Sequence, residues 1–426
     1  MNSAPAMTPD LDRATRDAPR SLVILGSTGS IGTQALDVVA SAARLARPVT
    51  DAEHPPFRVL ALAAGAGNLE LLARQAVDFA VAAVGTSGTA DDAARLRELL
   101  AARTRAASSA ALPEVFHGPE AATRIAEWNG TDVVLNGITG SIGLAPTLAA
   151  LTAGHRVALA NKESLIAGGP LVKRAAEATG LADALIPVDS EHSAIAQTLR
   201  SGTAGEVARL VLTASGGPFR GMNRAQLADV TPAQALKHPT WDMGVMVTTN
   251  SATMVNKALE VLEASLLFDV DLERIDVTVH PQSVVHSMVQ FVDGSTIAQA
   301  SPPDMRLPLA LGVGWPHRVT GAAVPCDWST AAQWTFEPLD AEAFPAVELM
   351  KRAGSLGGTW PAVFNAANEE AVHAFHRGEL GFTGIVDLVE RVVGDHDGVR
   401  EPTLEDVLEA ERWARAHAGE RISRGR

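Results

Sequence analysis

Tyrosine is absent from the 426-residue chain, cysteine occurs once, and aromatic residues make up only 4% of the sequence. Apolar residues still account for 46%, with alanine and valine abundant, so we expect aliphatic cores in two or three globular parts. The single cysteine, Cys326, excludes an intrachain disulfide, which favours a protein of the reducing cytoplasm.

Basic residues are few relative to acidic ones, 35 against 49, and the formal net charge is −14. A surface of this charge repels polyanions, so nucleic acid is not expected as a partner. Apolar runs of membrane-spanning length are missing as well, and no membrane segment is predicted. A few local cations can still hold a small phosphorylated substrate.

The amino-terminal half alternates short apolar runs with helical patterns. Strands are predicted at residues 21–25, 57–63, 79–84, 133–135, 157–160 and 185–188. This alternation predicts an α/β fold with a mostly parallel sheet that is covered on both faces.

The pattern changes after residue 210. A strand is predicted at 210–213, and loop-like chain around one short helix then runs to Gly244. A helix at 251–264, a strand at 275–279 and a hairpin around Asp293-Gly294 follow. Residues 315–340 are rich in turn residues and are interpreted as a linker, and residues 341–418 are mostly helical.

A glycine-rich turn, Gly26-Ser27-Thr28-Gly29-Ser30-Ile31-Gly32, lies between the first strand and the first helix. Glycines let the backbone approach a pyrophosphate, and helix N-terminal amides bind its charge. The spacing is a variant of the dinucleotide fingerprint, and the alternative is a purely structural turn. A near-copy at residues 137–143 is interpreted as a turn that lines the same sheet edge.

The second strand ends in Ala63-Ala64-Gly65-Ala66-Gly67-Asn68, without a carboxylate for the ribose hydroxyls, which favours NADP over NAD. The nearest cation in the sequence is Arg74, so a partner for the 2′-phosphate is not evident.

Carboxylates form the second signal. Asp189 and Glu191 follow an apolar strand, and in extended chain their side chains point to the same side. Two such groups repel unless a proton or cation lies between them, and oxygen ligands suit Mg²⁺ or Mn²⁺. Without further support, an ordinary surface pair is the commoner explanation.

The helix at 251–264 supplies that support. Asn256 and Glu260 are four residues apart on one face, with Lys257 beside them. One interpretation is a solvated Lys–Glu face. In the other, Asn256 and Lys257 hold a phosphate while Glu260 completes a metal site. Ser215-Gly216-Gly217 can add a hydroxyl and backbone amides to the same anion.

Histidines near these motifs have two interpretations, since a lone histidine is more often structural than catalytic. His238 follows the glycine-rich loop and precedes Trp241, which indicates a lid that closes on substrate. His280 and His286 lie near the hairpin, and at least one of them is expected to be simply packed.

Together these motifs resemble the 1-deoxy-D-xylulose 5-phosphate reductoisomerase family. The matching stretches, in family order, are GSTGSIG from Gly26, NKES from Asn161, PVDSEH from Pro187, SGGPFR from Ser215, HPTWDMG from His238, SATMVNKALE from Ser251, HPQSVVHSMV from His280 and NAANEEAV from Asn365.

The resemblance implies a cytoplasmic homodimer that uses NADPH and Mg²⁺ or Mn²⁺. It would rearrange and reduce 1-deoxy-D-xylulose 5-phosphate to 2-C-methyl-D-erythritol 4-phosphate, in the non-mevalonate isoprenoid pathway. The implied parts are a Rossmann-like NADPH domain, a central α+β catalytic domain with a mobile lid loop, and a C-terminal helical domain. We expect a disordered leader at 1–20, the NADPH domain at 21–180, the catalytic, metal-binding and dimerisation domain at 181–314, a linker at 315–340 and the helical domain at 341–426.

The resemblance also implies roles for single residues. Cofactor contacts are implied for Thr28, Gly29, Ser30, Ile31, Gly65, Asn68, Asn161, Glu163 and the Gly244 backbone. Metal binding is implied for Asp189, Glu191 and Glu260. Substrate contacts are implied for Lys162 and Ser190, phosphate contacts for Ser215, Ser251, Asn256 and Lys257 beneath His238, cover of the carbon backbone for Trp241 and Met243, and support for His192 and His286. Many members carry Lys or Arg where this chain has Ala66-Gly67, which leaves the 2′-phosphate contacts open.

Two other functions compete with this one. A plain NADP-dependent dehydrogenase of the semialdehyde or homoserine type would need no site of three carboxylates. A nucleotide-sensing binding protein would use the glycine turn as a receptor, and it would need neither a lid nor a metal and phosphate site.

Overall fold

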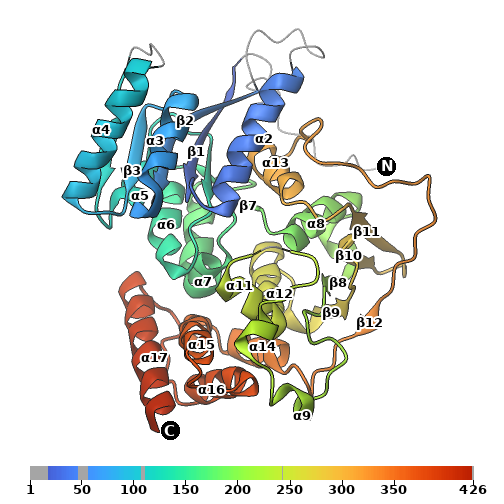
Figure 1. Cartoon of the computed structure of the whole chain (residues 1–426). Coiled ribbons are helices and arrows are strands. Elements are labelled where there is room, and N and C mark those ends of the chain that lie inside the picture. Colours follow the sequence, from blue (N-terminus) through green and yellow to red (C-terminus); the bar gives the residue numbers. More distant parts are fainter. Residues whose placement is uncertain (1–17, 47–55, 107–110, 242, 425–426) are drawn as a thin grey trace. The chain divides into compact units, whose positions relative to one another are not determined.

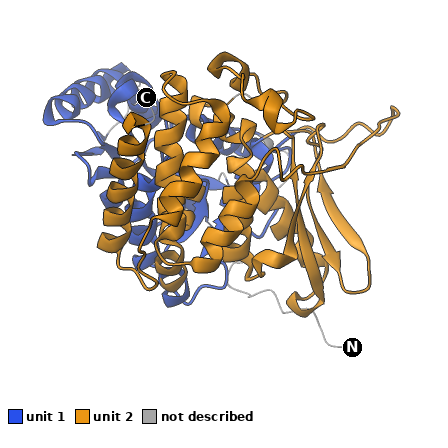
Figure 2. Ribbon diagram, turned by 90° about the horizontal axis from the view of Figure 1, so that it is seen from below, with its two compact units in different colours: residues 1–161, 175–188, 305–323 blue, residues 162–174, 189–304, 324–426 orange. Residues whose placement is uncertain are grey.

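The structure is a computed structural model, and it describes residues 18–46, 56–106, 111–241 and 243–424. Residues 1–17 of the predicted leader therefore lie outside the described residues. The first strand begins at Arg20. The chain divides into two compact units (Figure 2). Unit 1 comprises residues 1–161, 175–188 and 305–323, and unit 2 comprises residues 162–174, 189–304 and 324–426.

Unit 1 contains a seven-stranded sheet in the order β4-β3-β2-β1-β5-β6-β7, and all neighbouring strands are parallel (Figure 1). The strands are β1 (Arg20–Leu25), β2 (Phe57–Ala64), β3 (Ala83–Thr86), β4 (Glu114–His117), β5 (Val133–Asn136), β6 (Arg156–Leu159) and β7 (Leu185–Pro187). The chain order reverses between β1 and β5, and the crevice at such a point is where doubly wound sheets bind ligands.

Helices cover this sheet. They are α2 (Ser30–Ala46), α3 (Leu69–Asp78), α4 (Ala90–Ala106), α5 (Ala121–Ala126), α6 (Leu144–Thr152) and α13 (Arg306–Gly314), while α7 (Lys162–Ala178) contributes residues to both units. Helix α13 packs against α2 and the strands β5, β6 and β7. Residues 305–323 therefore cluster with unit 1, although we expected them at the end of the catalytic domain and in the linker.

Two differences from the predicted strands have local causes. The predicted strand at 79–84 starts at Ala83 instead, because Phe79 caps α3 and Ala80 has a positive φ of 49°. Strand β4 was not predicted, since it is a four-residue edge strand in which only Phe116 is buried.

Unit 2 contains a five-stranded sheet in the order β11-β10-β8-β9-β12. The strands are β8 (Val207–Ala214), β9 (Ile275–Val279), β10 (Val285–Phe291), β11 (Thr296–Ala300) and β12 (Glu337–Pro338); β8 and β9 are parallel and the other pairs antiparallel. The helices are α8 (Ser190–Thr198), α9 (Arg224–Leu227), α10 (Pro232–Ala235), α11 (Val245–Ala252), α12 (Val255–Phe268), α14 (Ala346–Leu356), α15 (Trp360–His376), α16 (Phe382–Gly394) and α17 (Leu404–Arg424).

The C-terminal helices share one apolar core with this sheet. The core extends from Leu210 on β8 through Leu259 on α12 to Phe364 and Phe375 on α15. A separate core in unit 1 gathers the strand residues Leu22 and Leu62 with Leu309 of α13. Within the described residues, no helix is long and apolar enough to cross a membrane.

Candidate active site

The first glycine turn lies at the carboxyl end of β1, where the sequence predicts it. The amides of Gly26 and Ser27 donate to the Ala63 carbonyl at 2.8 and 3.0 Å, which holds the turn against β2. Gly26 has a φ of +78°, and a Cβ there would lie 2.6 Å from the Gly137 oxygen. Helix α2 begins at Ser30, so its N-terminal amides follow the turn directly. Such an arrangement binds anions.

The second glycine turn, Gly137–Gly143, follows β5, which is the neighbour of β1 in the sheet. Its near-copy sequence therefore lines the same sheet edge, as predicted. Asn161 donates its amide protons to the carbonyls of Ile138 and Gly140, the latter at 2.8 Å. The predicted cofactor residue Asn161 thus also fixes the shape of this turn.

The end of β2 carries two more predicted cofactor residues. Asn68 caps α3, because its side chain accepts from the Leu71 amide at 3.0 Å. A Cβ at Gly65 would lie 3.8 Å from the Ser87 hydroxyl, so that hydroxyl approaches the same strand end. Arg74 instead lines a cavity with Phe57, at the opposite end of β2, and no cation lies among residues 65–68.

The predicted carboxylate pair is present, but its geometry differs from the prediction. Strand β7 ends at Pro187, and Asp189 is the N-cap of α8, where its side chain accepts from the Glu191 amide at 3.3 Å. Glu191 therefore lies in a helical turn and not in extended chain. Helix α12 supplies Glu260, and one oxygen from each of these three carboxylates lies within 4.8 Å of the others.

Two lysines, the partly buried Lys162 and the buried Lys257, neutralise most of this charge. The Lys162 ammonium lies 2.6 Å from Asp189 Oδ2 and 2.8 Å from Glu260 Oε1. The Lys257 ammonium lies 2.7 Å from Glu191 Oε1 and also contacts Glu260, whose side chain is 1% exposed. Asn256 contacts the same Glu260 and accepts from Lys162 at 3.1 Å. Three carboxylates against two ammonium groups leave one negative charge for a cation or a proton.

The pKa values follow from these contacts. Burial and the charge of Glu260 raise the pKa of Glu191 to about 7. Burial also acts on Asp189, but Lys162 and His192 outweigh it and hold the pKa of Asp189 well below its usual range. The carboxylates likewise raise the pKa of Lys162 and Lys257 against the effect of burial. Glu191 therefore takes up a proton more readily than Asp189.

His192 lies behind the carboxylates and is fully buried. Its Nε2 is 2.8 Å from the Glu260 carbonyl, to which it donates, and its Nδ1 is 3.1 Å from Glu263 Oε2. Burial opposes protonation, but the Glu263 charge raises the pKa of His192 to about 9. These two contacts fix the His192 ring against the main chain of Glu260 and the side chain of Glu263. Glu263 was not predicted, although its place three residues after Glu260 could have indicated it.

The loop of residues 215–217, which we call the anion loop after its predicted role, follows β8 and packs on the end of α11. Gly217 has a φ of +63°, and a Cβ there would lie 3.0 Å from the Ser251 carbonyl oxygen. The Ser215 hydroxyl oxygen accepts from the Gly217 amide at 3.2 Å and lies 3.1 Å from His238 Nε2. The chain from residue 218 to Gly244 contains two short helices, α9 and α10, where one was predicted.

The hydrogen bonds of His238 fix its tautomer. Its Nδ1 accepts from the amides of Thr240 and Trp241 at 3.1 and 2.9 Å, so the ring proton is on Nε2 and is donated to Ser215. Burial lowers the pKa of His238, which favours this neutral form. The Ser215 oxygen thus accepts two hydrogen bonds, and its own proton can be donated to an anion.

The remaining predicted residues fall into three groups. Trp241 and Met243 are partly buried in the segment that leads to Gly244, the N-cap of α11. The Ser190 hydroxyl donates a hydrogen bond to the Glu191 carboxylate. Glu163 is the second residue of α7, and burial raises the pKa of its carboxyl group. His286 is packed in β10, with Nε2 3.2 Å from the Ser301 carbonyl, and burial lowers its pKa to about 4. The other histidine of this motif, His280, is fully buried and its Nε2 accepts from two amides at 3.1 Å.

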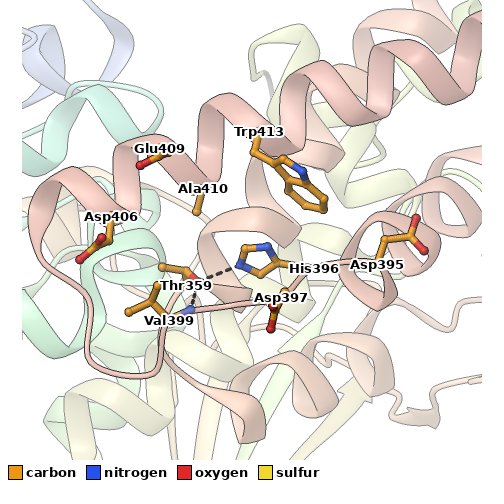
Figure 3. A pocket seen from close by; sticks show the side chains of 9 residues that line it. All are labelled: Thr359, Asp395, His396, Asp397, Val399, Asp406, Glu409, Ala410 and Trp413. Atoms are coloured by element: carbon orange, nitrogen blue, oxygen red, sulfur yellow. Dashed lines mark hydrogen bonds between the residues drawn. The ribbon is translucent and has the colours of Figure 1, made fainter.

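A separate pocket lies among the C-terminal helices (Figure 3). Thr359 contacts two other residues that line the pocket. Its hydroxyl lies 2.8 Å from His396 Nε2 and accepts a hydrogen bond from the Val399 amide at 3.1 Å. Of its acidic residues, Asp395 pairs with His417 at 2.9 Å and Asp406 accepts from Thr403 at the start of α17. The contacts of Thr359 and Asp395 connect different helices, whereas the Asp406 contact is local to the start of α17.

Three stretches of the chain match known sequence families. Residues 22–169 match the family described as 1-deoxy-D-xylulose 5-phosphate reductoisomerase. Residues 185–268 match the C-terminal domain of the same enzyme, and residues 300–417 match the DXP reductoisomerase C-terminal domain.

Relatives match over nearly the whole chain. The 1-deoxy-D-xylulose 5-phosphate reductoisomerase of Arthrobacter sp. (strain FB24) is 64% identical over 406 residues, which cover 95% of this chain and 98% of the relative. That of Kitasatospora griseola is 60% identical over 404 residues, 94% of this chain and 99% of the relative.

Two solved structures of the same enzyme are similar to this chain over nearly its whole length. The enzyme from Zymomonas mobilis in complex with NADPH matches with a TM-score of 0.84 at 38% identity, and the match covers 95% of this chain and 99% of that enzyme's chain. A DOX-P reductoisomerase in complex with NADPH, fosmidomycin and magnesium has a TM-score of 0.82 at 33% identity, with 95% and 98% covered. On these matches, the chain belongs to the 1-deoxy-D-xylulose 5-phosphate reductoisomerase family.

Proposed function

We propose that this protein rearranges 1-deoxy-D-xylulose 5-phosphate and reduces the product to 2-C-methyl-D-erythritol 4-phosphate, with NADPH and Mg²⁺ or Mn²⁺. It is then an NADP-dependent oxidoreductase that is also an intramolecular isomerase of isoprenoid precursor synthesis. The observation that carries the proposal is the cluster of Asp189, Glu191 and Glu260, whose oxygens lie within 4.8 Å of one another beside two lysines. A plain dehydrogenase or a nucleotide sensor has no need of it.

The donor atoms of this cluster fit the proposed cation. Carboxylate oxygens are the ligands that Mg²⁺ and Mn²⁺ prefer. A divalent cation held there would polarise the ketone and hydroxyl oxygens of the substrate and so stabilise the developing negative charge. NADPH, held at the glycine turn of residues 26–32, would supply the hydride.

The lysines compete with the cation for the same carboxylate oxygens. We propose that Lys162 turns to the substrate and that Lys257 joins Asn256, Ser215 and Ser251 in binding its phosphate. The three carboxylates would then hold a divalent cation in place of the ammonium groups, and the ammonium groups would have the substrate as their new partner. Binding energy from the phosphate holds the reacting carbons in place.

The neutral His238 ring has one function in this proposal. Because its Nδ1 accepts from the backbone, its Nε2 donates to Ser215 and orients that hydroxyl toward the phosphate. Trp241 and Met243 cover the carbon chain, and closure of residues 218–244 excludes water from the reaction.

We further propose that the protein acts in the cytoplasm as a homodimer. The β10–β11 hairpin and the segment after α13 expose large apolar side chains, which are Val292 and Ile297 in the hairpin and Val324 and Trp328 in the segment; Trp328 is 74% exposed. A second copy would cover such side chains. The division into an NADPH domain (21–180), a catalytic domain (181–314), a linker (315–340) and a helical domain (341–426) is part of the same proposal.

The test is NADPH oxidation with purified protein and 1-deoxy-D-xylulose 5-phosphate, followed by absorbance with and without Mn²⁺ and beside NADH. Metal-dependent oxidation that prefers NADPH is expected. Turnover that persists after chelation would favour a plain dehydrogenase, and tight NADPH binding without turnover would favour a sensor.

A further inference from the structure

The motif Asn365-Ala366-Ala367-Asn368-Glu369-Glu370-Ala371-Val372 lies on α15, and none of its residues belongs to the site described above. Its two asparagines are nevertheless almost fully buried, with Asn365 2% and Asn368 0% exposed. Burial of an amide is unfavourable unless the amide is hydrogen-bonded, so the partners of these side chains show what they do.

Asn368 holds α11. Its Nδ2 donates to Asn250 Oδ1 at 2.9 Å, and the Asn250 side chain is itself 5% exposed. Asn365, one turn earlier on the same helix, instead donates to Glu369 of α15 at 3.0 Å. The two asparagines therefore differ in function, because only Asn368 connects α15 to another helix.

A second hydrogen bond holds the neighbouring residue of α11. The Thr249 hydroxyl lies 2.8 Å from His376 Nε2 and donates to the Val245 carbonyl at 2.8 Å. Since the hydroxyl has one proton, His376 Nε2 must be the donor in the other bond. Two directional hydrogen bonds from α15 thus fix consecutive residues of α11, which determines the rotation of this short helix about its axis.

The rotation of α11 sets the place of Ser251. Ser251 follows Asn250 directly, and its carbonyl oxygen would lie 3.0 Å from a Cβ added at Gly217 of the anion loop. The other end of α11 is capped by Gly244, where the chain from residue 218 ends. A rotation of α11 about its axis would therefore move three features together: the proposed phosphate ligand Ser251, the backbone that the anion loop packs on, and the end of the segment 218–244.

We propose that Asn368 and His376 are positioning residues for the substrate phosphate, which they orient through Asn250 and Thr249 of α11. The inference rests on the proposed phosphate site at Ser215, Ser251, Asn256 and Lys257. An apolar pair would pack α11 on α15 equally well, but it would not select one rotation of the helix.

The test compares Asn368→Ala with Asn365→Ala, a matched control that removes a buried amide from the same helix without changing a contact to α11. The measurements are kcat, the Michaelis constants for substrate and NADPH, competitive inhibition by inorganic phosphate, and Tm. For Asn368→Ala we expect a rise of about tenfold in the substrate Michaelis constant and in the phosphate inhibition constant, as small displacements of binding groups produce. The Michaelis constant for NADPH should be unchanged, and Asn365→Ala should lower Tm only.

His376 provides a second pair of variants that does not depend on the folding of Asn368→Ala. His376→Ala should weaken phosphate binding, and His376→Gln should restore it, because the glutamine Nε2 can donate to Thr249 at the place of the imidazole Nε2. A merely structural function would lower Tm in both variants without this rescue.

Ser251→Ala separates the two proposals. If it weakens phosphate binding and Asn368→Ala does not, the positioning function is overturned and the phosphate site stands. If Ser251→Ala has no effect, the phosphate site itself is misplaced and the inference falls with it. Equal losses of phosphate affinity in Asn365→Ala and Asn368→Ala would show general loosening and would also overturn it.

Discussion

The burial of His286 predicts that the protein loses stability in mild acid for a reason that one substitution can remove. Its side chain is 6% exposed and its folded-state pKa is about 4, against a usual value of 6.5. Between these values the unfolded chain takes up a proton that the folded chain does not. The free energy of unfolding therefore falls as the pH drops below 6.5, and above that pH His286 contributes no pH dependence.

The magnitude follows from the two pKa values. At pH 5 the unfolded imidazole is almost fully protonated and the folded one is about one-tenth protonated, which corresponds to about 2 kcal/mol. The whole difference between the two pKa values corresponds to about 3.4 kcal/mol below pH 4. His286→Gln retains a donor for the Ser301 carbonyl, 3.2 Å from the native Nε2, but cannot titrate.

The assay is unfolding by urea or heat for the wild type and His286→Gln, at intervals from pH 8 to pH 4.5. The wild type should lose stability relative to the variant by about 2 kcal/mol between pH 7 and pH 5. His373→Gln, at an exposed position of α15, is the control. Parallel curves for the wild type and His286→Gln would show that His286 protonates inside the fold, and the argument from burial would be refuted.

Three further predictions concern the site. Glu260→Gln removes one of the three clustered carboxylates, so turnover should fall at least about 100-fold at millimolar Mg²⁺, and a normal metal titration of NADPH oxidation would exclude Glu260 from the metal site. Lys257→Ala should raise the Michaelis constant for substrate at least about tenfold, whereas Lys173→Ala, at the ion pair with Asp269, should leave it unchanged in the same assay. Gly26→Ala should lower Tm and weaken NADPH binding in a fluorescence titration, because its Cβ would lie 2.6 Å from the Gly137 oxygen. Gly118→Ala is the control, because Gly118 has a φ of +87° but open space where the Cβ would lie. An equal fall in Tm in this variant would show that backbone strain, and not the close contact, causes the effect at Gly26.

Sequence patterns predicted much of the fold because they report local preferences. Strand β9 has the predicted bounds, Ile275–Val279, and β10 and β11 flank Asp293-Gly294 as a hairpin. The predicted helix at 251–264 is broken, since Met254 has a φ of +62° and separates α11 from α12. A non-glycine residue in the left-handed region has no local signature that sequence reasoning could detect.

The candidate site also shows that local sequence patterns do not predict the geometry that tertiary packing produces. The sequence predicted that Asp189, Glu191 and Glu260 come together, and one oxygen of each lies within 4.8 Å of the others. It gave the wrong reason for the first two, because an Asp before a helix can act as its N-cap, which turns Glu191 into the helix. The contact of Lys162 with Glu260 joins residues 98 positions apart, and such a distance is fixed only by tertiary packing.

The order in which the chain contributes to its two units constrains its synthesis. Helix α13 packs on α2 and β5–β7, so unit 1 incorporates residues as late as 323 of 426. A ribosome must therefore make most of the protein before the nucleotide-binding sheet has its last covering helix. By that point it has also made β8 to β11 of unit 2, whose core still lacks α14 to α17. Until the last helices emerge, the nascent chain exposes apolar surface that chaperones recognise.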